Sequence, residues 1–324
     1  MPDESYPVNI EAPDISPYRK GNTGVDYVTT FASGKPGPHV MLSAIVHGNE
    51  LCGAIALDYL LRHEIRPVSG KLSLAFMNVA AFETFDIANP TLSRYVDEDF
   101  NRLWTREVLD GDRDSAELRR ARAVRPIVDE VDFLLDIHSM QHTTVPLMMC
   151  GPLDKGRRLA RDLSSPEHIV SDAGHAAGRR MRDYEGFGDA SSPRNALLVE
   201  CGQHWEPESV DVAKEIALRF LAHYQVIAPS FVEEHLTSPP PPEQKLIEVT
   251  GPITIESDDF HFTERFCGME VIAKKGTLIG WDGGSEVHTP YDNCVLIMPS
   301  RRLRKGESAV RFGRYVRLES SDLI

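Results

Sequence analysis

Two residues whose types and spacing suit metal chemistry, His47 and Glu50, stand three positions apart in the sequence HGNE. The apolar run over 40–46 is typical of a buried strand, and the apolar period over 51–61 predicts a helix. The pair is therefore expected where a strand meets a helix N-terminus, the usual place for chemistry in an α/β protein. An imidazole nitrogen and a carboxylate oxygen both suit Zn²⁺. Alone, the pair is equally compatible with a helix start whose polar side chains only cap and meet solvent.

A third metal ligand is expected at the end of another strand, because a catalytic zinc takes three protein ligands and keeps one position open. His138 follows the apolar run over 133–137. Asp136 lies two residues earlier on the same strand face, where a carboxylate can orient a ligand histidine. A structural histidine and an ordinary network carboxylate stay open as alternatives for these two residues.

Hydrolysis also needs a base that takes a proton from water and returns it to the leaving amine. Glu200 ends the apolar stretch NALLVE, and a glutamate is rarely buried without a reason. A carboxyl group buried at a strand end has the raised proton affinity that such a base requires. The alternative is a buried glutamate that forms an ion pair with an arginine.

A polar segment over 93–104, SRYVDEDFNRLW, contains Arg94, Asn101 and Arg102 in a loop that follows the second predicted strand. An arginine is suited to grip a carboxylate with two hydrogen bonds or to steady an oxyanion. The alternative for this loop is a solvated charged surface.

The segments that must position these residues alternate between strands and helices. The apolar patterns predict strands over 71–79, 133–139, 145–150 and 195–202, and helices over 114–131 and 208–227. The first 38 residues are expected to form an edge strand with turns. This alternation predicts an α/β fold with a mixed central sheet flanked by helices on both faces.

The segment over 229–243 breaks this alternation and is expected to be a stiff linker, because its run SPPPPEQ cannot continue a helix. Short apolar runs separated by Gly, Pro and Asp follow it and predict a small β-domain. The expected organisation is an α/β catalytic domain over 1–228, the linker over 229–243 and the β-domain over 244–324.

Composition excludes several kinds of partner. The chain of 324 residues has 35 Lys and Arg against 49 Asp and Glu, a formal net charge of −14, so binding to nucleic acid or an anionic membrane is not expected. No apolar run is long enough to span a bilayer, and the N-terminal residues lack the apolar core of a signal peptide. The five scattered cysteines indicate reduced thiols in a cytoplasmic protein.

Four separated motifs together resemble one family. HGNE after a strand, SRYVDEDFNR, LDIH and VECG occur in the order found in the aspartoacylase/succinylglutamate desuccinylase family, which belongs to the zinc carboxypeptidase clan. The resemblance implies a zinc carboxypeptidase-like fold and the following roles: His47, Glu50 and His138 as Zn²⁺ ligands, Glu200 as general base and acid, Arg94 as oxyanion stabiliser, and Asn101 with Arg102 as the site of the α-carboxylate of an N-acyl amino acid.

The same family uses a further Arg upstream of the catalytic Glu, and a Tyr from the C-terminal domain, to hold a second carboxylate. Arg194 and Tyr291 are the nearest candidates for these substrate-binding roles. The spacing of Arg194 differs from that in the family, and Tyr291 lies in a Thr-Pro-Tyr-Asp turn where it could equally pack a loop.

The expected function is that of a zinc-dependent amidohydrolase that removes an acyl group from a small N-acyl amino acid or a similar amide. A zinc carboxypeptidase acting on peptides is the nearest alternative, and a C-terminal domain that covers the cleft would exclude long peptides. A non-catalytic binding protein on the same scaffold is a third possibility, but it would have no need of a buried base such as Glu200. The sequence leaves the oligomeric state open, a homo-oligomer included.

Overall fold

The computed structural model describes residues 6–174, 177–237 and 243–317. Its strands in the first part of the chain follow the predicted apolar runs, with one further strand, β6, that the sequence pattern did not indicate. These strands are β1 (Val28–Ala32), β2 (His39–Ala44), β3 (Lys71–Phe76), β4 (Phe133–Met140), β5 (Leu147–Met149), β6 (His168–Ser171) and β7 (Asn195–Gln203).

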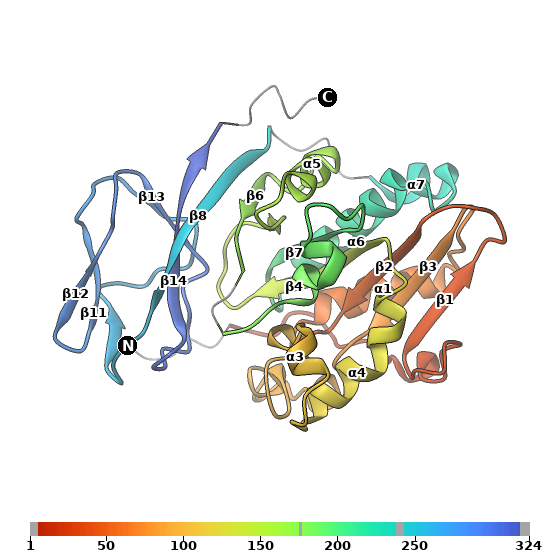
Figure 1. The fold of residues 1–324 in the computed structure, drawn as a ribbon, viewed down its shortest axis with the longest axis horizontal. Coiled ribbons are helices and arrows are strands. Elements are labelled where there is room, and N and C mark those ends of the chain that lie inside the picture. The colour runs from red at the N-terminus through yellow and green to blue at the C-terminus, as the bar shows by residue number, and fades with distance from the viewer. Residues whose placement is uncertain (1–5, 175–176, 238–242, 318–324) are drawn as a thin grey trace.

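The described residues beyond 243 are almost entirely strands and turns. They form β8 (Lys245–Thr254), β9 (Phe260–Phe262), β10 (Val271–Ile272), β11 (Leu278–Asp282), β12 (Ser285–His288), β13 (Cys294–Ile297) and β14 (Ser308–Val316). In the described part of the chain, 11 strands make one sheet in the order β1-β3-β2-β4-β7-β5-β6-β8-β14-β13-β10, and β12-β11-β9 make a small antiparallel sheet (Figure 1).

Helices connect the strands of the first part. They are α1 (Leu51–Arg62), α2 (Val79–Phe82), α3 (Arg106–Leu109), α4 (Ala116–Val128), α5 (Asp154–Asp162), α6 (Pro207–His223) and α7 (Pro229–His235). Each helix in the described ranges falls short of the length and apolar character needed to cross a bilayer.

Side chains that alternate along the central strands build a core on each face of the sheet. Leu42, Leu135 and Leu197 join the core that α1, α5 and α6 contribute to. Their sequence neighbours Met41 and Leu134 point the other way, into the core that includes residues of α4. The predicted fold class, a mixed sheet with helices on both faces, is confirmed.

The pairing of β2, β4 and β7 matters most for function. These strands are mutually parallel neighbours, so their carboxyl ends meet at one edge of the sheet. The register sets Ser43 of β2 beside Asp136 of β4, and His138 of β4 beside Glu200 of β7. Polar residues far apart in the sequence are thereby brought together at that edge.

Part of the expected linker is helical. Residues 229–235 form α7, with Pro229 in its first turn, where a proline is tolerated because the first helical N–H groups have no partner within the helix. The segment expected to be a linker therefore begins with a short helix, and its role as a linker stays a prediction. The run of prolines over 239–242 lies outside the described residues.

The C-terminal strands continue the central sheet instead of standing apart from it. Strand β8 pairs in parallel with β6, and β14, β13 and β10 extend the sheet further. Ile247 of β8 packs in one buried cluster with Leu147, Val170 and Leu198 of the first part. A second buried cluster lies wholly within the C-terminal part. The division at residue 244 stays a prediction, but the hydrogen-bonded sheet crosses it.

This continuity predicts that the C-terminal strands unfold together with the rest of the chain. Ile247→Ala, which removes a fully buried side chain, should lower the free energy of unfolding by about 2–5 kcal/mol in a single transition. Val271→Ala, at a side chain that is 48% exposed on β10, is the matched control and should change it by less than about 0.5 kcal/mol. Chemical denaturation followed by circular dichroism measures both. Two separate transitions would mean that the C-terminal part is an independent unit.

Candidate active site

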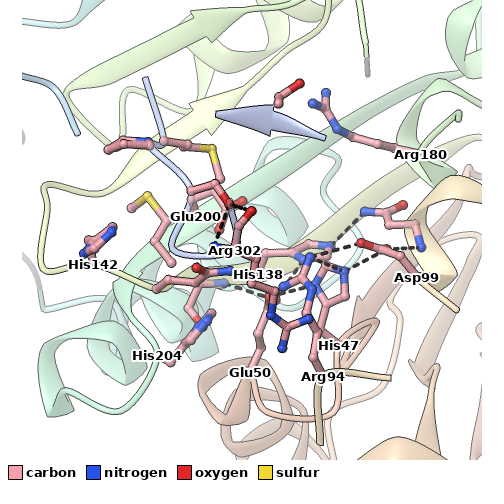
Figure 2. A pocket seen from close by; sticks show the side chains of 18 of the residues that line it. His47, Glu50, Arg94, Asp99, His138, His142, Arg180, Glu200, His204 and Arg302 are labelled. Atoms are coloured by element: carbon pink, nitrogen blue, oxygen red, sulfur yellow. Dashed lines mark hydrogen bonds and ion pairs between the residues drawn. The ribbon is translucent and has the colours of Figure 1, made fainter. Parts of the chain in front are cut away.

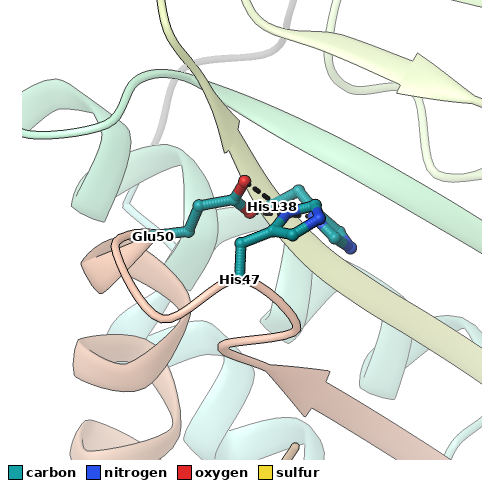
Figure 3. Close-up of side chains that lie close together, drawn as sticks. All are labelled: His47, Glu50 and His138. Carbon is teal, nitrogen blue, oxygen red and sulfur yellow. Dashed lines mark hydrogen bonds and ion pairs between the residues drawn. The ribbon is translucent and has the colours of Figure 1, made fainter. Parts of the chain in front are cut away.

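Three residues that can hold a metal ion come together at the carboxyl edge of the parallel strands. His47 and Glu50 lie on the turn between β2 and α1, and His138 lies near the end of β4 (Figure 3). One ligand atom from each lies within 4.8 Å of the others, and all three side chains are buried. Glu50 occupies the N-cap position of α1 without capping the helix, because its carboxylate turns toward the histidines.

The two imidazole rings present the same nitrogen, Nδ1, to the carboxylate of Glu50. His47 Nδ1 lies 2.7 Å from one carboxylate oxygen of Glu50, and His138 Nδ1 lies 2.8 Å from the other. The opposite nitrogens face aspartates: His47 Nε2 is 3.0 Å from Asp99, and His138 Nε2 is 2.8 Å from Asp136. A carboxylate beside Nε2 favours the tautomer that carries its proton there and leaves Nδ1 free as a ligand. This donor set fits Zn²⁺.

Opposite charges within the cluster stabilise each other and shift the pKa values of Glu50 and His138. Burial raises the pKa of Glu50, but His47 and His138 outweigh this and hold it well below its ordinary value. Burial lowers the pKa of His138, but Asp136 and Glu50 outweigh this and hold it well above its ordinary value. Ser43 donates a hydrogen bond of 2.7 Å to Asp136 and so helps to fix that carboxylate.

Glu200 lies on β7 directly beside His138 of β4. Its side chain is buried, and its Oε2 atom has no hydrogen-bond partner among the described residues. Burial, and then the charge of Glu50, raise the pKa of Glu200 to about 8, although nearby positive groups oppose this shift. A buried carboxyl group with an unused oxygen and a pKa near neutrality is suited to proton transfer.

Arg94 reaches the metal-binding cluster from the loop between α2 and α3. Its Nη2 lies 2.9 Å from His47 Nε2 and 3.2 Å from Asp99, and its Nη1 lies 3.5 Å from Glu50. A protonated Nε2 cannot accept a hydrogen bond, so in the metal-binding tautomer Arg94 bonds Asp99 instead. Asp99 and Glu50 raise the pKa of Arg94 against the effect of burial, which leaves a charged guanidinium at the wall of the cavity.

Asn101 and Arg102 also line the cavity. The side chain of Asn101 accepts a hydrogen bond of 2.8 Å from Met181 N, and its Nδ2 lies 3.4 Å from His138 Nε2. Arg102 Nη2 lies 3.7 Å from Asp99, and burial lowers the pKa of Arg102 to about 10. Asp99 was not predicted as a site residue, although its place two residues before Asn101 in the motif could have indicated it.

The cavity around these residues has a volume of about 260 Å³ (Figure 2). The α/β part supplies the wall that holds the metal-binding cluster, Arg94 and Glu200. The C-terminal part supplies the facing wall, which includes Met298, Arg302, Glu307 and Arg311. The cavity is therefore completed by residues on both sides of the expected domain boundary.

Two further arginines of the cavity wall were missed by sequence reasoning. Arg180 and Arg311 are buried and share the carboxylate of Asp172, which accepts a hydrogen bond of 3.0 Å from Arg180 and a second one from Arg311. Burial raises the pKa of Asp172, but the two arginines outweigh this and lower it to about 2. Arg180 Nη1 has no hydrogen-bond partner among the described residues. Neither arginine lies in a motif, so only the folded chain reveals the pair.

Arg194 and Tyr291 do not line the cavity. Arg194 donates hydrogen bonds of 2.8 and 2.7 Å to the backbone carbonyls of Val131 and Val128. The hydroxyl of Tyr291 lies 2.6 Å from that of Thr250 in the C-terminal part. This corrects the expectation that the two residues bind substrate, because both side chains are engaged elsewhere.

Comparison with solved structures gives similar folds. A succinylglutamate desuccinylase/aspartoacylase from Rhodobacter sphaeroides aligns with a TM-score of 0.62 at 19% identity, over 90% of this chain and 89% of that chain. The succinylglutamate desuccinylase from Chromobacterium violaceum gives 0.65 at 15% identity, over 91% and 90%. The product-bound ectoine utilization protein EutE from Ruegeria pomeroyi gives 0.58 at 15% identity, over 90% and 92%.

Comparison at the level of sequence gives the family. No curated protein matched the chain. The family model described as the succinylglutamate desuccinylase/aspartoacylase catalytic domain matches residues 36–224, a range that contains the metal-binding cluster and Glu200. Because this match covers more than half of the chain, the protein belongs to the succinylglutamate desuccinylase/aspartoacylase family.

Proposed function

We propose that this protein is a zinc-dependent, cytoplasmic amidohydrolase that removes the acyl group from an N-acyl amino acid or a similar small amide. The observation that carries the proposal is the buried carboxyl oxygen of Glu200, which has no hydrogen-bond partner in the described part of the chain and lies beside a His–Glu–His set suited to a metal ion. Membership of the family supports the reaction class, because both names in the family's description refer to removal of an acyl group.

His47, Glu50 and His138 would hold the Zn²⁺. When bound, Zn²⁺ would polarise the scissile carbonyl and acidify the attacking water. Asp99 and Asp136 would keep the two imidazole rings in the orientation that binding needs.

Glu200 would move the proton. Its free oxygen would accept a proton from the attacking water and then deliver it to the leaving nitrogen. Burial removes bulk solvent from around this carboxyl group and, with the charge of Glu50, raises its pKa to about 8, which suits a group that first accepts a proton and then donates it.

Positively charged side chains would hold the substrate. The guanidinium of Arg94 would donate hydrogen bonds to the oxyanion that forms at the acyl carbon. Arg102, with Asn101, would bind the α-carboxylate, since a desolvated guanidinium gains from an anionic partner. In place of Arg194 and Tyr291, Arg180 and Arg311 would face a second anionic group of the substrate.

The lining of the cavity supports a small substrate over a peptide. Residues of the C-terminal part, among them Arg302 and Arg311, form one wall of the cavity, and a long chain would have to pass this wall. This supports a deacylase over the alternative carboxypeptidase. Glu200 supports an enzyme over a binding protein, because metal binding alone does not require a buried carboxyl group with an unused oxygen.

Replacing a ligand should remove the metal. His47→Ala should lose both zinc and activity, because two ligands remain where a catalytic zinc needs three. Elemental analysis should find about one zinc per chain in the wild type and a small fraction of that in the variant. His261→Ala, at an exposed histidine of β9, is the control and should keep the metal. Full metal content in His47→Ala would exclude His47 as a ligand.

Replacing the base should separate metal binding from turnover. Glu200→Gln should fold and bind zinc normally, but kcat should fall by about 10²–10⁴-fold because an amide cannot accept the proton. Elemental analysis and the rate of amine release from N-acyl amino acids measure the two properties. Turnover close to that of the wild type would remove Glu200 from the mechanism.

Arg102→Lys should weaken recognition of the substrate's α-carboxylate although the charge is kept, because lysine cannot form two parallel hydrogen bonds. We expect KM for the acid to rise about tenfold, the equivalent of about 1.4 kcal/mol. The α-amide analogue should be a poor substrate for the wild type, and the variant should lose most of that preference. Arg106→Lys, at an exposed arginine paired with Glu185, is the control. Equal use of acid and amide by the wild type would contradict the assignment.

A further inference from the structure

Glu117, in the first turn of α4, has a fully buried carboxylate that lies outside the cavity. Its oxygens accept hydrogen bonds from three consecutive backbone N–H groups, those of Val96 (2.7 Å), Asp97 (3.1 Å) and Glu98 (3.2 Å). Asn78 Nδ2 donates a fourth bond of 3.0 Å. Within the described residues Glu117 forms no ion pair, so these neutral donors are what stabilise its charge.

A buried carboxylate is costly unless its oxygens are fully hydrogen-bonded. Consecutive backbone N–H groups form a concave site that favours an anion, and the N-terminus of α4 adds its own partial positive charge. The contact is reciprocal, because the carboxylate of Asp97 accepts a hydrogen bond of 2.7 Å from Ala116 N at the start of the same helix. Two independent contacts therefore join the loop to α4.

The clamped segment 96–98 lies between residues of the cavity. Arg94 precedes it, and Asp99, Asn101 and Arg102 follow it. Upstream, the carbonyl of Arg94 accepts a hydrogen bond of 3.1 Å from Gly48 N, within the turn that carries the metal-binding pair. A Cβ at Gly48 would lie 2.4 Å from the carbonyl oxygen of Ser93, so the loop and this turn are closely packed.

Besides the bond from Ala116 to Asp97, the outer side of the segment has one ion pair, in which Glu98 lies 2.8 Å from Arg113. Because that arginine is largely exposed, the pair adds little stability. The side chain of Val96 is 47% exposed, and Asp97 is exposed as well. A shift of this segment would move Arg94 and Asp99 together, because one lies two residues before it and the other directly after it. Asp99 in turn faces His47, so the position of the loop affects both substrate recognition and the histidine's orientation.

We propose that Glu117 is a positioning residue, which acts by holding the loop that carries Arg94, Asp99, Asn101 and Arg102 against the metal-binding turn. The roles of those four residues rest on the proposed function, but the holding of the loop does not. Glu117→Gln tests it, since the amide keeps the size of the side chain and replaces an accepting oxygen with a donating NH₂ group opposite the backbone N–H groups.

The first measurement is hydrogen exchange followed by mass spectrometry, which needs no substrate. In Glu117→Gln, exchange of the amides over 96–98 should become at least tenfold faster, while that of β4 and β7 should stay unchanged. A merely structural role would speed exchange throughout the domain to a similar degree. Unchanged exchange over 96–98, or an equal increase in β4 and β7, would overturn the proposal.

The second measurement is kinetic. With zinc content and secondary structure unchanged, kcat/KM of Glu117→Gln for an N-acyl amino acid should fall on the order of 10²-fold, since a displacement near 1 Å can cost that much. Glu117→Asp keeps the carboxylate and should recover part of the loss. Glu107→Gln, at an exposed acid in the first turn of α3, is the matched control and should behave as the wild type in both measurements.

The two measurements separate the possible failures. If the wild type does not hydrolyse N-acyl amino acids, the proposed function fails, and the exchange data still decide whether Glu117 holds the loop. If exchange over 96–98 is faster but kcat/KM is unchanged, the positioning role is overturned.

Should Glu117→Gln not fold, Asp97→Asn weakens the same junction from its exposed side, and faster exchange over 96–98 in that variant is the expected result. Unchanged exchange there would count against the proposal.

Discussion

The buried carboxylate of Glu50, placed between the Nδ1 atoms of His47 and His138, is the contact on which the rest of the site depends. The charge of this carboxylate must be balanced, either by protons on the two rings or, under the proposed function, by the metal ion that the three side chains would hold. Both arrangements need the other nitrogen of each ring to be held as well. Asp99 and Asp136 provide this, and each has its own support, from the loop over 94–102 and from Ser43 on the neighbouring strand. The surroundings of the buried Glu50 carboxylate thus include residues of the neighbouring strands and of the loop over 94–102.

The second feature of the molecule is the contrast between its overall charge and that of its cavity. The chain carries a formal net charge of −14, yet Arg94, Arg102, Arg180 and Arg311 all line the cavity. Acidic partners such as Asp99 and Asp172 fix the arginines in place. Under the proposed function, this arrangement concentrates positive charge where an anionic substrate would bind, and the acidic surface elsewhere would repel the same substrate.

The C-terminal strands have two roles at once. By pairing with β6 they cover what would otherwise be an open edge of the central sheet, a position that is prone to unwanted pairing. Strand β14 and the loop that precedes it also bring Arg311 and Arg302 to the cavity. The C-terminal part therefore contributes both to the central sheet and to the wall of the cavity.

The sequence by itself determined the fold class and most of the parallel strands. It also indicated which polar residues stand at the carboxyl ends of β2, β4 and β7, because apolar periodicity and residue type are local properties. His47, His138 and Glu200 could be proposed because each follows an apolar run, and Glu50 because it stands three positions after His47. Only the tertiary structure decided that Arg180 and Arg311 share Asp172, that Arg194 and Tyr291 are engaged elsewhere, and that Glu117 accepts hydrogen bonds from the backbone of the loop. Those contacts join segments up to 139 residues apart, and no local pattern encodes which distant residues a strand register and a loop path will bring together.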